Sequence, residues 1–213
     1  MIRDIEIKKA FSQSMLWDLQ RRYFHEKGVE AWASQVPFYI TSNPVIAHTY
    51  AQIFIHFMRD LKNSGQWDSS QAIYILELGT GSGRFSYYCL QELVRLQALF
   101  DLSDVKFCYV MSDFTQRNID FWDQHALLKP FVNSGHLDFA LYNLETDTHL
   151  HLIKQHKTLE KNSLNNPLLV VGNYIFDTIT HDVFRVQDQH VLAAPISLRT
   201  DETNMQGHEV VAL

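Results

Sequence analysis

The N-terminal part of the chain carries apolar residues at helical spacing. Four of them recur at four-residue steps within residues 3–26, which predicts an amphipathic helix. They are Ile7, Phe11, Met15 and Leu19. Residues 34–43 break this pattern and indicate a loop with a short extended piece. Asn43-Pro44 is then typical of a helix start, because asparagine is a good N-cap and proline suits the first helical position. We expect this second helix to run to about Leu61.

From residue 71 onward, short apolar runs alternate with longer amphipathic segments. The runs predict strands at 73–78, 105–111, 137–141, 167–171, 183–186 and 191–198. The segments between the earlier runs predict helices at 84–99 and 115–128, and a polar helix or helical loop at 147–161. Strands that alternate with helices imply a mostly parallel sheet with right-handed crossovers. We therefore expect an α/β, Rossmann-like fold with helices on both faces of the sheet and additional N-terminal helices. The expected domains are a helical cover over residues 1–65 and a ligand-binding domain over residues 66–213.

Composition narrows the classes of function. The 213 residues suit one globular domain, and the formal net charge of -6, with no basic cluster beyond Arg21-Arg22, disfavours nucleic acid as the main partner. Two cysteines are too few for a disulfide framework, and no apolar run approaches the length of a membrane span. We expect a cytoplasmic protein without a membrane partner. We also expect no metal site, since the densest histidine group, His149, His151 and His156, has no cysteine or acid nearby to complete a coordination sphere.

The turn after the first predicted strand is the most informative segment. It reads Glu77-Leu78-Gly79-Thr80-Gly81-Ser82-Gly83-Arg84. A dinucleotide site needs a glycine where Arg84 stands, and a P-loop needs a glycine-lysine pair that is absent here. The remaining pattern, an acid followed by three alternating glycines, is that of S-adenosylmethionine (SAM) proteins. An acid also suits the cationic ammonium and sulfonium of SAM. We assign Glu77, Gly79, Thr80, Gly81 and Gly83 to SAM; the alternative is a structural turn without a ligand.

Polar residues follow the other predicted strands and complete a candidate site. Asp113 is expected to accept hydrogen bonds from the ribose hydroxyls, with a helix cap as the alternative. Asn143 and Leu144 are assigned to the adenine, although a plain loop explains them almost equally well. Asn173 and Asp177 follow the fourth strand, where an acceptor would meet the methyl group; the alternatives are a helix cap and a solvated acid.

Several segments, in the same order, resemble the MidA-type SAM-dependent methyltransferases, which are relatives of a mitochondrial complex I assembly factor that methylates arginine. The resembling segments are Phe38–Ile46, Glu77–Arg84, Tyr109–Asp113 with Gln116-Arg117, and Gly172–Ile179 with Val183–Val186. The family has an asparagine-glutamate pair where this chain has Asn173-Tyr174, and a proline where it has Thr180. Because the absent glutamate would orient a guanidinium group, its loss argues against arginine as the acceptor.

The resemblance implies a class I methyltransferase fold, SAM as cofactor and a protein side chain as methyl acceptor. In such a site the residues mainly position the reactants and exclude water. The chain ends soon after the fifth strand, where a full methyltransferase sheet adds an antiparallel hairpin, so we expect a truncated or variant domain. Three alternatives stay open: a non-catalytic SAM-fold binding or assembly factor, a small-molecule methyltransferase, and a nucleotide-dependent oxidoreductase, which Arg84 disfavours.

Overall fold

A computed structural model describes residues 2–33 and 39–201. It forms two compact units: Met1–Glu26 with Phe176–Leu213, here called the terminal unit, and Lys27–Ile175, here called the sheet unit. These units divide the chain at other places than the expected boundary between residues 65 and 66. Residues 34–38 of the expected loop and residues 202–213 of the expected ligand-binding domain lie outside the described residues.

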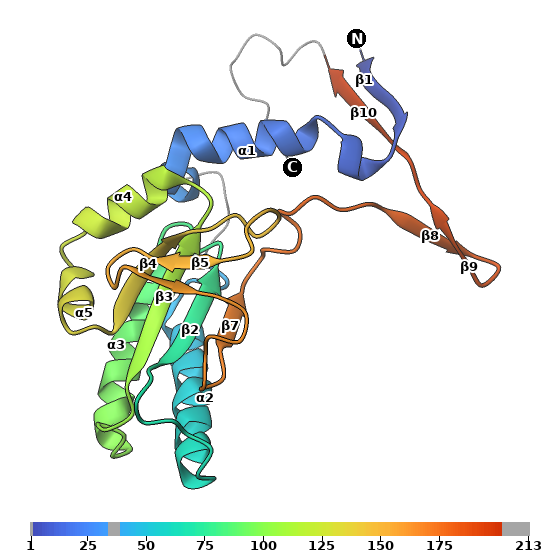
Figure 1. Ribbon diagram of the computed structural model, residues 1–213. Helices are drawn as coiled ribbons and strands as arrows, with labels where there is room; N and C mark the ends of the chain where they lie inside the picture. Colours follow the sequence, from blue (N-terminus) through green and yellow to red (C-terminus); the bar gives the residue numbers. More distant parts are fainter. Residues whose placement is uncertain (1, 34–38, 202–213) are drawn as a thin grey trace. The chain divides into compact units, whose positions relative to one another are not determined.

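The sheet unit is built on four parallel strands (Figure 1). They are β2 (Ile73–Leu78), β3 (Phe107–Asp113), β4 (Leu137–Leu141) and β7 (Leu169–Gly172). Their spatial order, β4-β3-β2-β7, puts the first of them in the interior, with the second and third on one side and the fourth on the other. This confirms the predicted parallel α/β sheet and is compatible with a Rossmann-like fold. The strand order reverses between β2 and β7, and in open α/β sheets ligands bind at such a switch point.

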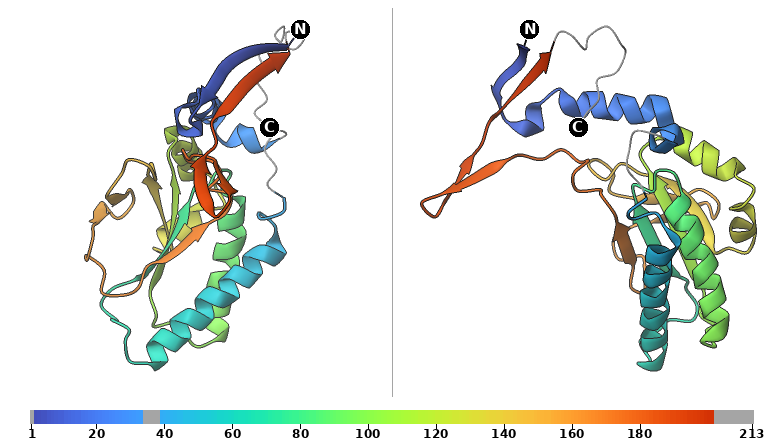
Figure 2. Two further views of the ribbon diagram at one scale, coloured as in Figure 1. Left: turned by 90° about the vertical axis from the view of Figure 1, so that its right-hand side faces the viewer. Right: turned by 180° about the vertical axis from the view of Figure 1, so that it is seen from behind.

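Helices cover one face of this sheet. They are α2 (Pro44–Asn63), α3 (Arg84–Leu99) and α4 (Gln116–Gln124), and α2 and α3 lie side by side (Figure 2). The predicted helix start at residue 43 is confirmed, because the Asn43 side chain accepts hydrogen bonds from the Val45 and Ile46 amides. The strand residues that face these helices are buried, among them Ile75, Tyr109 and Phe139.

The helix predicted at 115–128 is in fact two helices. The first, α4, ends at Gln124, and α5 (Lys129–Asn133) follows it. Pro130 lies in the first turn of α5, where proline needs no amide hydrogen.

The opposite face of the sheet is covered by a β-hairpin, so the expectation of helices on both faces is wrong. The hairpin consists of β5 (Leu150–Leu152) and β6 (Lys157–Leu159), in the region where we predicted a polar helix or helical loop over 147–161. Leu150 and Leu152 are both buried with an exposed His151 between them, which is the two-residue period of a strand. The buried Asp138 carboxylate anchors the turn, accepting hydrogen bonds from the Lys154 and Gln155 amides at 2.8 and 2.9 Å.

The terminal unit begins with a strand, which corrects the helix predicted over residues 3–26. β1 (Ile2–Lys9) pairs antiparallel with β10 (Ile196–Asp201), and only after η1 (Phe11–Gln13) does α1 (Leu16–Lys27) begin. The four-residue step from Ile7 to Phe11 is therefore not a helical face: Ile7 lies on β1 and is 64% exposed.

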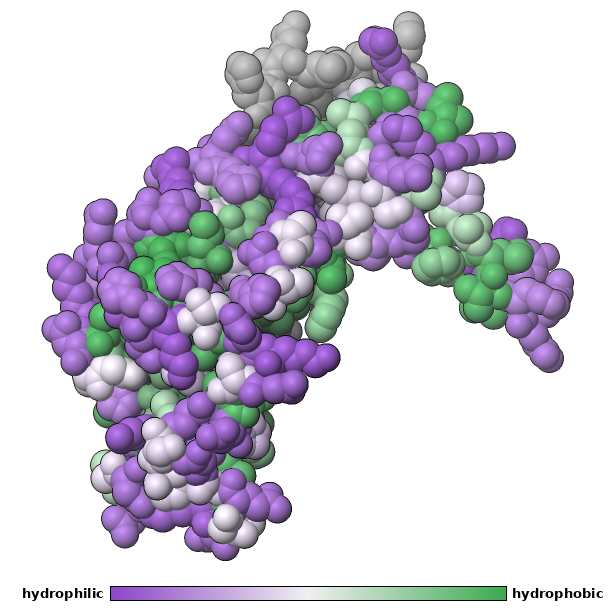
Figure 3. Space-filling view, in the orientation of Figure 1, coloured by the Kyte–Doolittle hydropathy of each residue, from purple (hydrophilic) through white to green (hydrophobic). Residues whose placement is uncertain are grey.

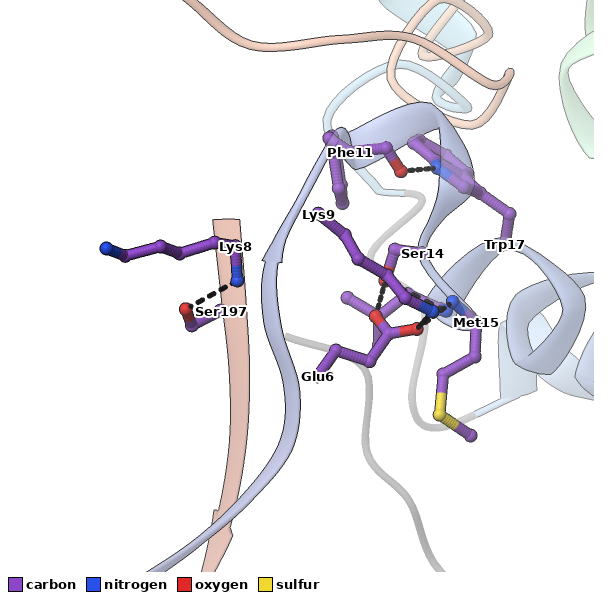
Figure 4. Close-up of polar contacts among 9 residues, drawn as sticks. Glu6, Lys8, Lys9, Phe11, Ser14, Met15, Trp17 and Ser197 are labelled. Atoms are coloured by element: carbon purple, nitrogen blue, oxygen red, sulfur yellow. Dashed lines mark hydrogen bonds and ion pairs between the residues drawn. The ribbon is translucent and has the colours of Figure 1, made fainter. Parts of the chain in front are cut away.

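A buried carboxylate, Glu6, joins β1 to the start of α1 (Figure 4). It accepts hydrogen bonds from the Ser14 hydroxyl at 2.6 Å, the Met15 amide at 3.0 Å and the Lys9 ammonium at 2.9 Å. The Ser14 bond is the largest cause, followed by Lys9, of a lowering of the Glu6 pKa to about 2. Trp17 fixes the same corner, because its indole N–H donates to the Phe11 carbonyl.

Strands β8 (Phe184–Gln187) and β9 (His190–Ala193) form an antiparallel hairpin around the polar residues Asp188 and Gln189. The second strand predicted for this hairpin, 191–198, is divided between β9 and β10. Apolar side chains on the hairpin are exposed, among them Phe184 and Val186 (Figure 3). In the part of the chain that the structure describes, no helix has the length and apolar character needed to cross a membrane.

Truncation of Leu152 tests the packing of the β5–β6 hairpin. Leu152 is fully buried, so Leu152→Ala should lower the free energy of unfolding by about 2–5 kcal/mol, through lost burial and the cavity left behind. The neighbouring His151→Ala changes an exposed side chain and should stay within about 0.5 kcal/mol of the wild type. Urea denaturation measures both, and equal effects would contradict the packing described here.

Candidate functional site

The candidate site centres on the glycine loop, residues 79–83, which joins β2 to α3. Gly79, Gly81 and Gly83 have φ values of +62°, +62° and +75°, a region that residues with a Cβ rarely adopt. Two hydrogen bonds tie the loop to β3: the Thr80 amide donates to the Ser112 carbonyl at 2.9 Å, and the Ser112 amide donates to the Thr80 hydroxyl at 3.2 Å. The predicted turn between strand and helix is confirmed, and it lies at the switch point of the sheet.

Asp113, at the end of β3, holds the loop from one side. One carboxylate oxygen accepts a hydrogen bond from the Gly81 amide at 3.1 Å, and the other accepts from the Thr115 amide at 3.0 Å and the Thr115 hydroxyl at 2.9 Å. Burial raises the pKa of this carboxyl, while hydrogen bonds from Asn118, Thr115 and Gly81 oppose the shift. Asp113 thus bonds to Thr115, the residue before α4, and not to the amides of the first helical turn, whose N-cap has no side-chain capping bond. Binding of a ribose by Asp113 stays a prediction.

Glu77 lies beneath the loop, on the face of the sheet that α3 covers. Its carboxylate accepts hydrogen bonds from the Ser86 hydroxyl of α3 at 2.5 Å and from the Tyr109 hydroxyl of β3 at 2.9 Å. Burial raises the pKa of Glu77 to about 7, against the opposing effect of these bonds. In this conformation the acid therefore binds the helix that follows the loop and the neighbouring strand. Its predicted contact with the cationic end of SAM is not tested.

Aromatic and aliphatic side chains surround the loop, beyond the residues that the glycine motif identifies. A Cβ built on Gly81 would lie 2.6 Å from Trp32 Cζ2, and one built on Gly79 would lie 2.6 Å from Ile175 Cδ1. The Trp122 indole of α4 donates a hydrogen bond to the Gly81 carbonyl at 3.1 Å. Both backbone polar groups of Gly81 are thus hydrogen-bonded, and Trp32 fills the position that a side chain at residue 81 would take.

The residues assigned to the adenine form a local turn. The Asn143 side-chain oxygen accepts a hydrogen bond from the Glu145 amide at 3.1 Å, and the Asn143 amide donates to the Asp147 carboxylate at 2.8 Å. Leu144 is half-buried within the same turn. This geometry fits the alternative of a plain loop, and no adenine contact follows from it.

The two residues assigned to the acceptor belong to different compact units. Asn173 follows β7 in the sheet unit, and its side-chain oxygen accepts a hydrogen bond from the Tyr50 hydroxyl of α2 at 3.3 Å. Asp177 is an exposed residue of the terminal unit. The structure therefore adds Tyr50 to the neighbourhood of Asn173, a contact that connects positions 123 residues apart and leaves no local signal in the sequence.

One buried polar atom close to Asp113 lacks a partner among the described residues. Asn118 lies in the first turn of α4 and is only 1% exposed, yet its side-chain oxygen has no hydrogen bond. The side chain does hydrogen-bond to Asp113, on which it acts to lower the pKa. A buried acceptor without a donor is rare and calls for an explanation. Within residues 2–33 and 39–201, no group of three or more histidine, cysteine or acidic side chains is placed to hold a metal ion.

The raised pKa of Glu77 predicts a pH dependence of stability. The folded protein keeps a proton that the unfolded chain releases between pH 4.5 and about 7. The contribution of Glu77 to stability is therefore complete below pH 4.5 and is lost as the pH rises through about 7. Across that interval we expect the free energy of unfolding of the wild type to fall by about 3 kcal/mol relative to that of Glu77→Gln, as measured by urea denaturation of both proteins. If the free energies of unfolding of the two proteins changed with pH in parallel, the Glu77 carboxyl would have an ordinary pKa.

No protein-family model and no curated protein matches the chain. Among solved structures, the chain is similar to the crystal structure of a protein from Burkholderia thailandensis described as an uncharacterised ACR, with 12% sequence identity and a TM-score of 0.39. The match covers 88% of this chain and 46% of that protein, so this chain spans about half its length. A likeness at this level establishes neither a shared fold nor a shared family. The assignment of the site therefore depends on the residues of this chain.

Proposed function

We propose that the sheet unit binds SAM on the glycine loop and that the chain is a SAM-dependent methyltransferase whose acceptor is a protein side chain. The observation that carries this proposal is the loop itself. Three left-handed glycines follow an interior strand at the switch point of a parallel sheet, and Asp113 ends the neighbouring strand.

The chemistry of the loop suits SAM better than a nucleotide with phosphates. The side chains nearest the loop backbone include Glu77 and Asp113, both acids, and the net charge of the chain is -6. An anionic pyrophosphate gains nothing from such surroundings, whereas a ligand with a sulfonium and an ammonium group does. The missing Cβ atoms of Gly79 and Gly81 also let a ligand approach the backbone closely, provided that Ile175 and Trp32 move aside.

When bound, SAM supplies a methyl group that its sulfonium already activates. The work left to the protein is to orient the reactants and to exclude water. Asp113 and Trp122 would contribute by fixing Gly81 before the ligand arrives. Asn173, at the end of β7, would face the acceptor, with its side-chain amide oriented by Tyr50.

A second candidate function is that of a SAM-fold binding or assembly factor without catalysis. One observation favours it: Tyr174 stands where the resembling family has a glutamate, and it adopts a left-handed conformation with φ +51° and 59% exposure. A strained, exposed aromatic residue offers no carboxylate to an acceptor. Strain of this kind persists only where the surrounding structure maintains it, which is common at contact surfaces and active sites.

Isothermal titration with SAM and with S-adenosylhomocysteine tests the proposed cofactor. We expect saturable binding by the wild type and no detectable binding by Gly81→Val, because a side chain there would occupy the ligand's approach. Gly65→Val is the matched control: Gly65 also has a positive φ, +70°, but nothing lies within 4 Å of its Cβ position. It should therefore bind like the wild type.

Methyl-labelled SAM then separates the two candidate functions. Label on a protein acceptor supports the methyltransferase, label on a small molecule changes the acceptor class, and binding without transfer to either supports the non-catalytic factor. Failure to bind SAM, together with binding of NADH, would overturn the proposal in favour of an oxidoreductase.

A further inference from the structure

A short helical segment, η2 (Gly28–Ala33), lies against the candidate site at two points. Its first residue contacts the start of α4, and Trp32, near its end, contacts the glycine loop. We call this segment the strap. It belongs to the sheet unit, so its contacts with the loop and with α4 are contacts within one compact unit.

Trp32 covers Gly81 with the face of its indole. A Cβ built on Gly81 would lie 2.6, 2.8 and 3.0 Å from three consecutive ring atoms, Cζ2, Cε2 and Cη2. Such similar distances place the glycine over the ring plane, since an approach in the plane would bring one atom much closer than its neighbours. At this separation no ligand atom fits between the indole and the loop. Trp32 therefore occupies the surface on which the proposed ligand would lie.

The other end of the strap covers Asn118. Gly28 has a φ of +54°, and a Cβ built on it would lie 2.8 Å from Arg117 Cδ and 3.2 Å from the side-chain oxygen of Asn118. That oxygen is the buried acceptor without a donor among the described residues. Burying such a group is unfavourable, and the closed strap supplies it with no hydrogen bond. Asn118 also hydrogen-bonds to Asp113, the residue assigned to the ribose.

We propose that the strap is a mobile cover: Trp32 takes the place of the adenosyl group in the closed state, and the strap lifts when SAM binds. A ribose hydroxyl then donates to the exposed Asn118 oxygen beside Asp113. This inference rests on the proposed function. The Glu30–Arg117 ion pair between the strap and α4 measures 3.7 Å between largely exposed side chains, and an ion pair of this kind contributes little to holding the strap closed. Because SAM binds only the open state, its apparent affinity is reduced by the fraction of molecules that are open.

Trp32→Ala tests the cover by titration with S-adenosylhomocysteine. Without the indole the open state becomes more populated, so we expect the dissociation constant to fall by about tenfold relative to the wild type. Trp32→Phe keeps a smaller ring and should fall between the two. Trp67→Phe is the control, because it removes another half-buried indole of the sheet unit that packs on the core of α2 and α3.

In the wild type, the ligand should also shift the fluorescence emission of Trp32 to longer wavelength. Trp32→Phe should lack this shift, and Trp67→Phe should retain it.

Asn118→Ala tests the second contact. We expect it to weaken binding of S-adenosylhomocysteine about fivefold in the Trp32→Ala background, as the loss of one hydrogen bond would. Weaker binding by Trp32→Ala than by the wild type would overturn the mobile cover but not the proposed function, because Trp32 would then contribute to ligand binding. Unchanged affinity on truncation of Asn118 would overturn the ribose contact. Absence of binding by the wild type and by Trp32→Ala would instead overturn the proposed function, and the cover with it.

Discussion

The carboxylate of Asp113 connects two segments that meet only in the folded chain. It accepts a hydrogen bond from the Gly81 amide after β2, and from Thr115 at the start of α4 after β3. Gly81 is held from its other side by the Trp122 indole, so neither of its backbone polar groups is left unpaired. The candidate site depends on this pair of contacts, because they set the path of the loop between its left-handed glycines. A loop fixed in this way can keep its conformation when the proposed ligand replaces Trp32, so that ordering the loop adds little to the entropic cost of binding.

The same arrangement explains why the acids near the loop form hydrogen bonds within the protein. Asp113 and Glu77 are almost fully buried, and their carboxylates accept hydrogen bonds from the side chains or amides that surround them. For the proposed SAM site, we therefore give these acids the role of maintaining the loop. In the proposed open state, direct contact with the ligand falls to groups that Trp32 covers in this structure.

The parts of the fold that the sequence predicted well are those with strong local signals. The turn from β2 to α3 is marked by its glycines, and α3 begins and ends where the amphipathic pattern does. The errors arose where two periods compete over a short segment. Ile5-Glu6-Ile7 alternates as a strand does, but Ile7 also begins an apparent four-residue stripe, and pairing with β10, about 190 residues away, decided the outcome. Likewise apolar and polar residues alternate in Leu150-His151-Leu152, but this strand is too short to stand out from the polar residues around it.

The candidate site was predictable only in part, for a physical reason. Backbone conformation leaves a trace in the sequence, since left-handed turns favour glycine, and so Gly79, Gly81 and Gly83 were found. Contacts between distant side chains leave no such trace. Trp32 against Gly81, Tyr50 with Asn173 and the unpaired oxygen of Asn118 all depend on the packing of elements far apart in the chain.

Hydrogen exchange of the backbone amides, with and without SAM, tests the central claim most directly. If the loop that Asp113 holds is the ligand site and the strap is its cover, saturating SAM should slow exchange in residues 79–83 and speed it in residues 28–33, while the β5–β6 hairpin keeps its rate. Unchanged exchange in both segments would contradict the account, if a separate titration shows that the SAM concentration used is saturating.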